Sequence, residues 1–119
     1  GLIEHAGQVG GHLGDRLAEL SERHPSVGDT RGVGLFRGIE LSRHPEKRVP
    51  FGTRADKLSK GKTVVDEVSA AAMDRGVYVA NMINTLIIAP PICISETDVD
   101  QAVDVLDNAL EIADAAMED

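Results

Sequence analysis

Residues 76–95 contain two short apolar runs on either side of a polar turn, then a Pro-Pro pair, and then a helix start. The apolar runs predict two short, largely buried strands, Val77–Ala80 and Thr85–Ala89. Residues 81–84, with an asparagine at each end, predict the hairpin turn between them, because asparagine is favoured in turns. The proline pair has no backbone N–H groups, so the second strand cannot continue through it.

A further strand is predicted upstream, at Val33–Leu41, where residues alternate between two faces. Arg37 shares its face with the aliphatic residues of this segment. Two glycines occupy the other face, and glycines inside a strand suggest a bulge or a close approach of another backbone. Just before this strand, Gly28-Asp29 has the composition of a turn.

Three segments have the period of amphipathic helices: Leu2–Arg23, Thr63–Arg75 and a last helix that starts at the N-cap Ser95. Four glycines weaken the first helix or allow another element to pack closely against it. They are Gly7, Gly10, Gly11 and Gly14. These elements predict an α+β fold of two layers, with an antiparallel sheet of about three strands covered by the first and last helices.

The composition narrows the range of partners. The formal net charge of −8 disfavours nucleic acid as the main partner, although residues 43–62 form a basic segment that is expected to be a solvated surface loop. No apolar run is long enough for a membrane span. Cys93, the only cysteine, rules out an internal disulfide and favours a cytoplasmic location. Its apolar neighbours predict a buried, inert thiol.

The residues alone predict no self-contained catalytic site and no metal site. His5 and His12 could share one side of the first helix, but no cysteine or His/Glu cluster completes a ligand set around them. The Gly32-Val33-Gly34 segment lacks the context and the Lys-Ser/Thr ending of a phosphate loop.

Five motifs in order resemble the C-terminal small domain of class III pyridoxal-phosphate-dependent aminotransferases, which have the type I fold of such enzymes. The resemblance covers nearly the whole of residues 1–119 as one domain, and it implies that a larger, cofactor-binding domain lies outside this sequence. The first residues already follow a helical period, so we expect a truncated chain. The motifs are Val-Gly-Asp-Thr-Arg-Gly-Val-Gly-Leu at 27–35, Gly-Ile-Glu-Leu at 38–41, Asp-Arg-Gly-Val at 74–77, Leu-Ile-Ile-Ala-Pro-Pro-Ile at 86–92 and Ile-Ser-Glu-Thr-Asp-Val-Asp at 94–100.

The resemblance implies a homodimeric enzyme that uses pyridoxal phosphate to transfer an amino group from an amine or ω-amino acid to a keto acid. The partners of this chain would be its own large domain and the second subunit. No lysine here matches the context of the family's Schiff-base lysine, so the isolated chain is expected to be inactive. The four lysines are Lys47, Lys57, Lys60 and Lys62. The alternative is a stand-alone α+β interaction or regulatory module.

The resemblance also indicates where substrate would be bound. Many family members have an arginine for a substrate carboxylate near the end of the small-domain hairpin. The two corresponding positions are Ala80 and Ile87, and neither is charged. Asn81 and Asn84 are therefore candidates to line the pocket, with ordinary turn residues as the alternative, and Arg37 is a candidate cation if it turns toward the cleft.

Overall fold

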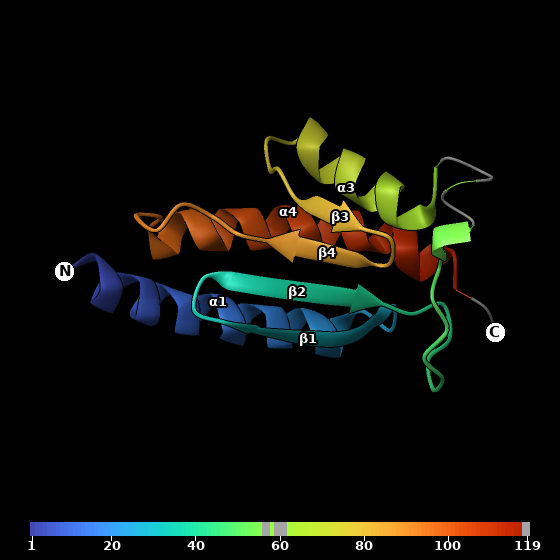
Figure 1. Cartoon of the computed structure of the whole chain (residues 1–119), viewed down its shortest axis with the longest axis horizontal. Coiled ribbons are helices and arrows are strands. Elements are labelled where there is room, and N and C mark those ends of the chain that lie inside the picture. The colour runs from blue at the N-terminus through green and yellow to red at the C-terminus, as the bar shows by residue number, and fades with distance from the viewer. Residues whose placement is uncertain (56–57, 59–61, 118–119) are drawn as a thin grey trace.

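The computed structural model describes residues 1–55, 58 and 62–117. Among these residues, the helices with assigned bounds are α1 (Leu2–Arg23), α3 (Val64–Asp74) and α4 (Glu96–Ala115). In Figure 1, α1 and α4 lie behind the sheet, and α3 lies along the side of its last strand. The predicted two-layer α+β architecture is confirmed. Within the described residues, no helix is long and apolar enough to cross a membrane.

The sheet has four antiparallel strands among the described residues, one more than the sequence predicted. They are β1 (Val27–Val33), β2 (Phe36–Leu41), β3 (Ala80–Met82) and β4 (Thr85–Ile88), in the spatial order β1-β2-β4-β3. The two hairpins therefore meet where β2 pairs with β4. This pairing places residues that are far apart in the sequence on one surface.

The predicted single strand Val33–Leu41 is wrong, because the chain reverses inside it. Val33 pairs with Phe36, which leaves a two-residue turn that begins at Gly34. Gly34 has a φ of 57°, in the left-handed region that glycine adopts without a steric penalty. The strand before this turn, β1, includes Gly28-Asp29, where the sequence predicted a turn instead.

The second hairpin is shorter than predicted. The expected strand Val77–Ala80 is wrong in its bounds, since β3 covers Ala80–Met82 and only Ile83 and Asn84 form the turn. The residues before β3 are bonded to α3 instead of to a strand. The Val77 amide donates to the Ala72 carbonyl at 3.0 Å, and the Ser69 hydroxyl donates to the Val79 carbonyl at 2.6 Å.

The helix ends follow the local sequence signals. The Ser95 side chain accepts a hydrogen bond from the Asp98 amide at 3.1 Å, as its N-cap position predicts. Thr63 and Asp66 form a reciprocal capping box at the start of α3. Gly76 follows α3 with a φ of 87°, the left-handed conformation that glycine commonly adopts just after a helix.

The core between the two layers is aliphatic. Alternate residues of the strands face the helices, and Ile39 and Leu86 are completely buried there. Each helix contributes one stripe to the same core, and the largest fully buried of these side chains are Leu17, Leu20, Val65, Val68, Val99, Val103, Leu106 and Leu110.

Candidate functional site

The face of the sheet that points away from the helices is the candidate functional site. Ala80 and Ile87 are direct cross-strand partners there. The register continues across the sheet, because Ile87 pairs with Gly38 and Gly38 pairs with Arg31. Arg31, Gly38, Ile87 and Ala80 therefore form one row across four strands, which we call the outer row.

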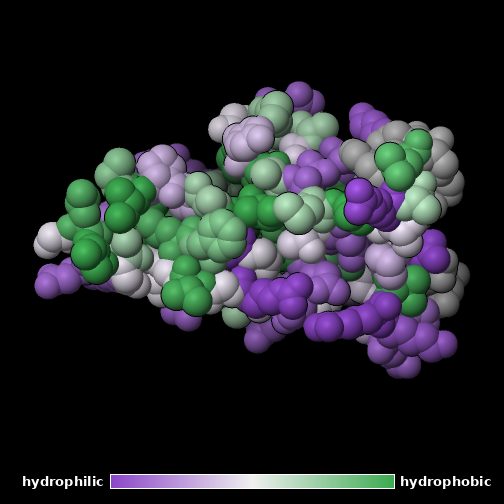
Figure 2. Space-filling model, viewed as in Figure 1, coloured by the Kyte–Doolittle hydropathy of each residue, from purple (hydrophilic) through white to green (hydrophobic). Residues whose placement is uncertain are grey.

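A shallow depression of about 420 Å³ lies over part of the outer row. Gly38 and Ile87 of the outer row line it, together with Arg31, Gly32, Val33, Phe36, Arg37 and Thr85. Val33 and Phe36 are 85% and 66% exposed, so two large apolar side chains lie on the surface at this depression. Figure 2 shows this face, with hydrophobic side chains gathered toward the left of the view and hydrophilic ones toward the lower right.

Of the two arginines among the residues that line this depression, Arg31 lies on the outer face of the sheet. Its Nη2 atom donates to the Glu40 carboxylate at 3.1 Å, and Nη1 lies 3.9 Å from Asp29. Asp29 is also bonded by Arg48 at 3.4 Å. Because the Arg31 side chain is 63% exposed, its ion pairs are worth only about 0–1 kcal/mol.

Arg37, the other candidate cation, points to the opposite side of the sheet. Its Nε atom donates to the Gly34 carbonyl at 2.8 Å, Nη1 to the Gly32 carbonyl at 3.2 Å and Nη2 to the Gly10 carbonyl at 2.9 Å. The guanidinium thus joins the β1–β2 turn to α1. Its donors face backbone oxygens on the helix side of the sheet.

The two candidate asparagines also have partners within the domain. Asn81 lies on the helix face of β3, opposite Leu86, and its amide donates to Asp66 of the capping box. Asn84 donates to the Leu41 carbonyl at 2.6 Å and accepts from the Phe51 amide at 3.0 Å. These contacts hold the second hairpin against α3 and against the segment after β2. Of the five candidate positions, only Ala80 and Ile87 share the outer face.

A second cavity, of about 600 Å³, lies between α4, the end of α3 and residues 88–94. Its walls are mostly apolar, with Arg75 and Asp98 among the lining residues. No nucleophile in this lining is paired with a general base, so the cavity has no arrangement for nucleophilic catalysis.

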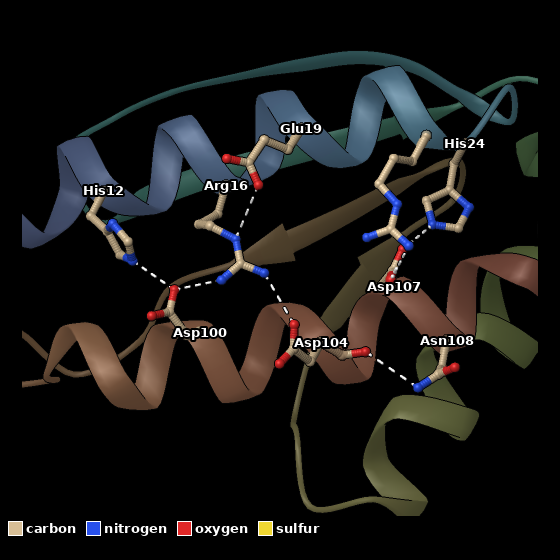
Figure 3. Close-up of polar contacts among 9 residues, drawn as sticks. His12, Arg16, Glu19, His24, Asp100, Asp104, Asp107 and Asn108 are labelled. Carbon is tan, nitrogen blue, oxygen red and sulfur yellow. Dashed lines mark hydrogen bonds and ion pairs between the residues drawn. The ribbon is translucent and has the colours of Figure 1, made fainter.

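The densest group of charges lies between α1 and α4 (Figure 3). Asp100 is bonded by His12 at 2.7 Å and by Arg16 at 2.6 Å, and Arg16 also reaches Asp104 at 3.1 Å. The hydrogen bond from His12, together with the Arg16 guanidinium, lowers the pKa of Asp100 although partial desolvation opposes this. Each of these charged side chains has a partner of opposite charge on the facing helix. We call this row of ion pairs the α1–α4 seam, and it stabilises the packing of α1 against α4.

His24 ends the same seam and is only 5% exposed. Its Nδ1 atom lies 2.5 Å from Asp114, and its Nε2 atom lies 2.6 Å from Asp107. Burial lowers the pKa of His24, but the hydrogen bonds and charges of the two carboxylates outweigh it, and the net pKa is raised. Asp114 also accepts from the Ser26 hydroxyl at 2.6 Å. Sequence reasoning missed this cluster, because its members are about 80 to 90 residues apart.

The two histidines considered for a metal do not converge. His5 contacts the Ile94 carbonyl at 2.7 Å, whereas His12 contacts Asp100. Among the described residues, no group of three or more metal-ligating side chains is arranged to hold an ion. Cys93 is exposed, so the prediction of a buried thiol is wrong. The turn in which the Ile94 amide donates to the Pro91 carbonyl carries Cys93 away from the core.

Pyridoxal phosphate requires a lysine for its covalent attachment. Of the lysines that the structure describes, Lys47 and Lys62 are both exposed, and neither lines either cavity. Lys57 and Lys60 lie outside the described residues. The described part of the chain therefore does not fit the covalent attachment of this cofactor.

Comparison with known proteins gives a consistent result. The sequence model of the family described as Aminotransferase class-III matches residues 1–110. The isoleucine 2-epimerase of Lentilactobacillus buchneri is 34% identical over 110 residues, covering 92% of this chain and 22% of that protein. The taurine–pyruvate aminotransferase of Rhodobacter capsulatus is 32% identical, covering 92% of this chain and 24% of that protein.

Solved structures share the fold. A transaminase from the marine bacterium Virgibacillus is 29% identical with a TM-score of 0.80, covering 96% of this chain and 25% of that one. The chain thus spans about a quarter of the length of the proteins it matches. The family match, over nearly all of the sequence, and the shared fold agree, and the chain belongs to the class III aminotransferase family.

Proposed function

We propose that this chain is the C-terminal small domain of a longer aminotransferase, which transfers an amino group from an amine or ω-amino acid to a keto acid. The observation that carries the proposal is the family match over residues 1–110 in a chain that spans about a quarter of its relatives. Pyridoxal phosphate would supply the electron sink for the reaction. Its lysine would come from the larger domain.

The role proposed for this domain is to form one wall of the substrate site. A bidentate arginine is the usual way to hold a carboxylate firmly. At the paired positions Ala80 and Ile87 the outer face offers a methyl group and an aliphatic side chain instead. Such a wall favours donors that present an apolar or unbranched chain here over donors whose α-carboxylate must be held at this place. The taurine–pyruvate aminotransferase among the relatives is named for a donor without an α-carboxylate.

Two further properties belong to the proposal. The full-length enzyme is proposed to be a homodimer, which light scattering of the purified protein would test; a monomer would contradict it. A cytoplasmic location is proposed because one cysteine allows no internal disulfide. Cell fractionation would test this, and recovery from a secreted fraction would contradict it.

The decisive experiment uses the full-length enzyme with pyridoxal phosphate, pyruvate and a panel of amine, ω-amino acid and α-amino acid donors. We expect transamination with the first two classes. Because one relative is an epimerase, the same assay should follow the chirality of the donor. Epimerisation without amino transfer would overturn the proposal.

The donor preference is tested by Ala80→Arg and Ile87→Arg. Either arginine should raise kcat/KM for α-carboxylate donors about tenfold, the usual scale of one charge-assisted hydrogen bond. Met73→Arg is the control, because Met73 is an exposed residue of α3 and lies away from the outer row. If neither variant changes the preference, and a full-length structure places both positions far from the cofactor, the proposed wall is wrong.

A further inference from the structure

The outer row holds one cation whose present partner is a surface carboxylate. Arg31 and Gly38 are cross-strand partners, and Gly38 has no side chain to separate the Arg31 guanidinium from Ile87 on the next strand. Neighbouring strands lie about 4.8 Å apart. A guanidinium that leaves Glu40 can therefore lie across Gly38 and enter the depression.

We propose that this depression binds a small organic anion with an apolar body, and that Arg31 supplies the cation. The anion would replace Glu40 as the partner of Arg31, while the body would contact Ile87 and Phe36. Thr85 adds a hydroxyl group to the lining. This deepens the proposed function, on which it rests for the identity of the natural ligand, whereas binding itself is a property of this chain.

The charges around the depression determine how tightly it is expected to bind the anion. Glu40 competes with the ligand for Arg31 and repels an anion, because it stays beside the row. Asp29 opposes binding of the anion less than Glu40 does, since Arg48 also contacts the Asp29 carboxylate at 3.4 Å. Removing the charge of Glu40 should therefore tighten binding, and removing that of Arg31 should weaken it. A general effect of charge would give the same two signs, so a cation removed away from the depression is needed as the control that identifies a built site.

The test is a titration of this chain, labelled with ¹⁵N, with sodium 3-methylbutanoate at constant ionic strength. We expect saturable shifts of the amide signals of Arg31, Gly38, Thr85 and Ile87. The neutral isostere 3-methylbutanamide should not cause them, because it lacks the charge. Acetate should bind more weakly, because it lacks the apolar body.

Variants then assign the contacts. Arg31→Gln should weaken binding about fivefold, the upper end for an exposed ion pair. Glu40→Gln should tighten it about two- to threefold by the same reasoning. Gly38→Ala adds a methyl group 3.4 Å from Thr85 Cγ2, an ordinary contact, so it should fold normally and weaken binding by filling part of the depression. Arg75→Gln removes the same charge from the end of α3 and should leave these shifts unchanged.

Several results would overturn the proposal: equal shifts with the amide, equal affinity for acetate or inorganic phosphate, or no change in Arg31→Gln. A loss of binding in Arg31→Gln counts only if its spectrum keeps the dispersion of the folded chain. Glu40→Gln provides an independent criterion. A folded Glu40→Gln variant that does not bind the anion more tightly would contradict the replacement of Glu40 by the anion as the partner of Arg31. If binding occurs but the full-length protein does not transaminate, only the proposed function is wrong.

Discussion

The Arg37 guanidinium donates a hydrogen bond to the Gly10 carbonyl at 2.9 Å, which fixes the β1–β2 turn to the middle of α1. The approach is close enough that a Cβ atom on Gly10 would lie 2.5 Å from the carbonyl carbon of Gly34. This explains why an otherwise amphipathic helix contains a glycine here. It also gives Arg37 a structural role on the helix side, away from the outer row.

Gly10→Ala should destabilise the chain by about 1–3 kcal/mol, because the added methyl group must displace the backbone of the β1–β2 turn. Gly11→Ala is the matched control. A Cβ atom there meets no atom within 4 Å, so this variant should gain up to about 1 kcal/mol from helix propensity. Urea unfolding measures both. Equal stability of the two variants would contradict the close contact.

The His24 bridge should make stability depend on pH. Only the protonated imidazole has two N–H donors, so only the charged form satisfies both Asp107 and Asp114. The folded-state pKa is raised above 6.5, so this contribution is fully present below pH 6.5 and is lost as the pH rises through the folded-state pKa. Urea unfolding from pH 6 to 9 should show this decline.

Replacing His24 should remove that decline. His24→Gln should cost about 2 kcal/mol at pH 6, because Asp114 loses its cation and Asp107 keeps only Arg23 as a charged partner. Its stability should then vary less with pH. His5→Gln is the control, since a neutral imidazole can already donate to the Ile94 carbonyl. A parallel pH profile for His24→Gln and the parent would show that His24 is not the titrating group.

Ile83 should be a strained position. It has a φ of 58°, where a β-branched side chain is disfavoured. Ile83→Gly relieves the steric conflict and should raise the free energy of unfolding by up to about 1 kcal/mol. Ile83→Ala keeps the Cβ atom and should give little gain. Thermal unfolding compares them, and a less stable glycine variant would argue that the Ile83 side chain contributes packing that outweighs the strain.

The isolated chain should not bind pyridoxal phosphate through one specific lysine. Incubation with the cofactor and borohydride, followed by mass spectrometry, measures this. We expect only partial labelling scattered over the four lysines, because none matches the family's attachment site. Stoichiometric labelling of a single lysine would contradict the prediction, and repeating the reaction with that lysine changed to arginine would identify it.

Local signals in the sequence determined the helices and their ends. The apolar stripes and the cap at Ser95 each depend on residues within a few positions, and both were predicted correctly. The family could also be identified from the sequence, because each of its motifs is a contiguous run of residues and their order along the chain is distinctive. The helix predictions succeed because helix periodicity and capping are short-range interactions.

Tertiary structure decided the strand bounds and the candidate site. Alternation alone could not show that Val33–Leu41 contains a reversal, since the reversal is defined by the pairing of Val33 with Phe36 across β1 and β2. Nor could it show that Arg31 and Ile87 flank the same glycine. That neighbourhood depends on the register between hairpins about 50 residues apart, which long-range core packing sets. The sequence by itself determined the family and the helices, whereas only the packed sheet determined which side chains share a surface.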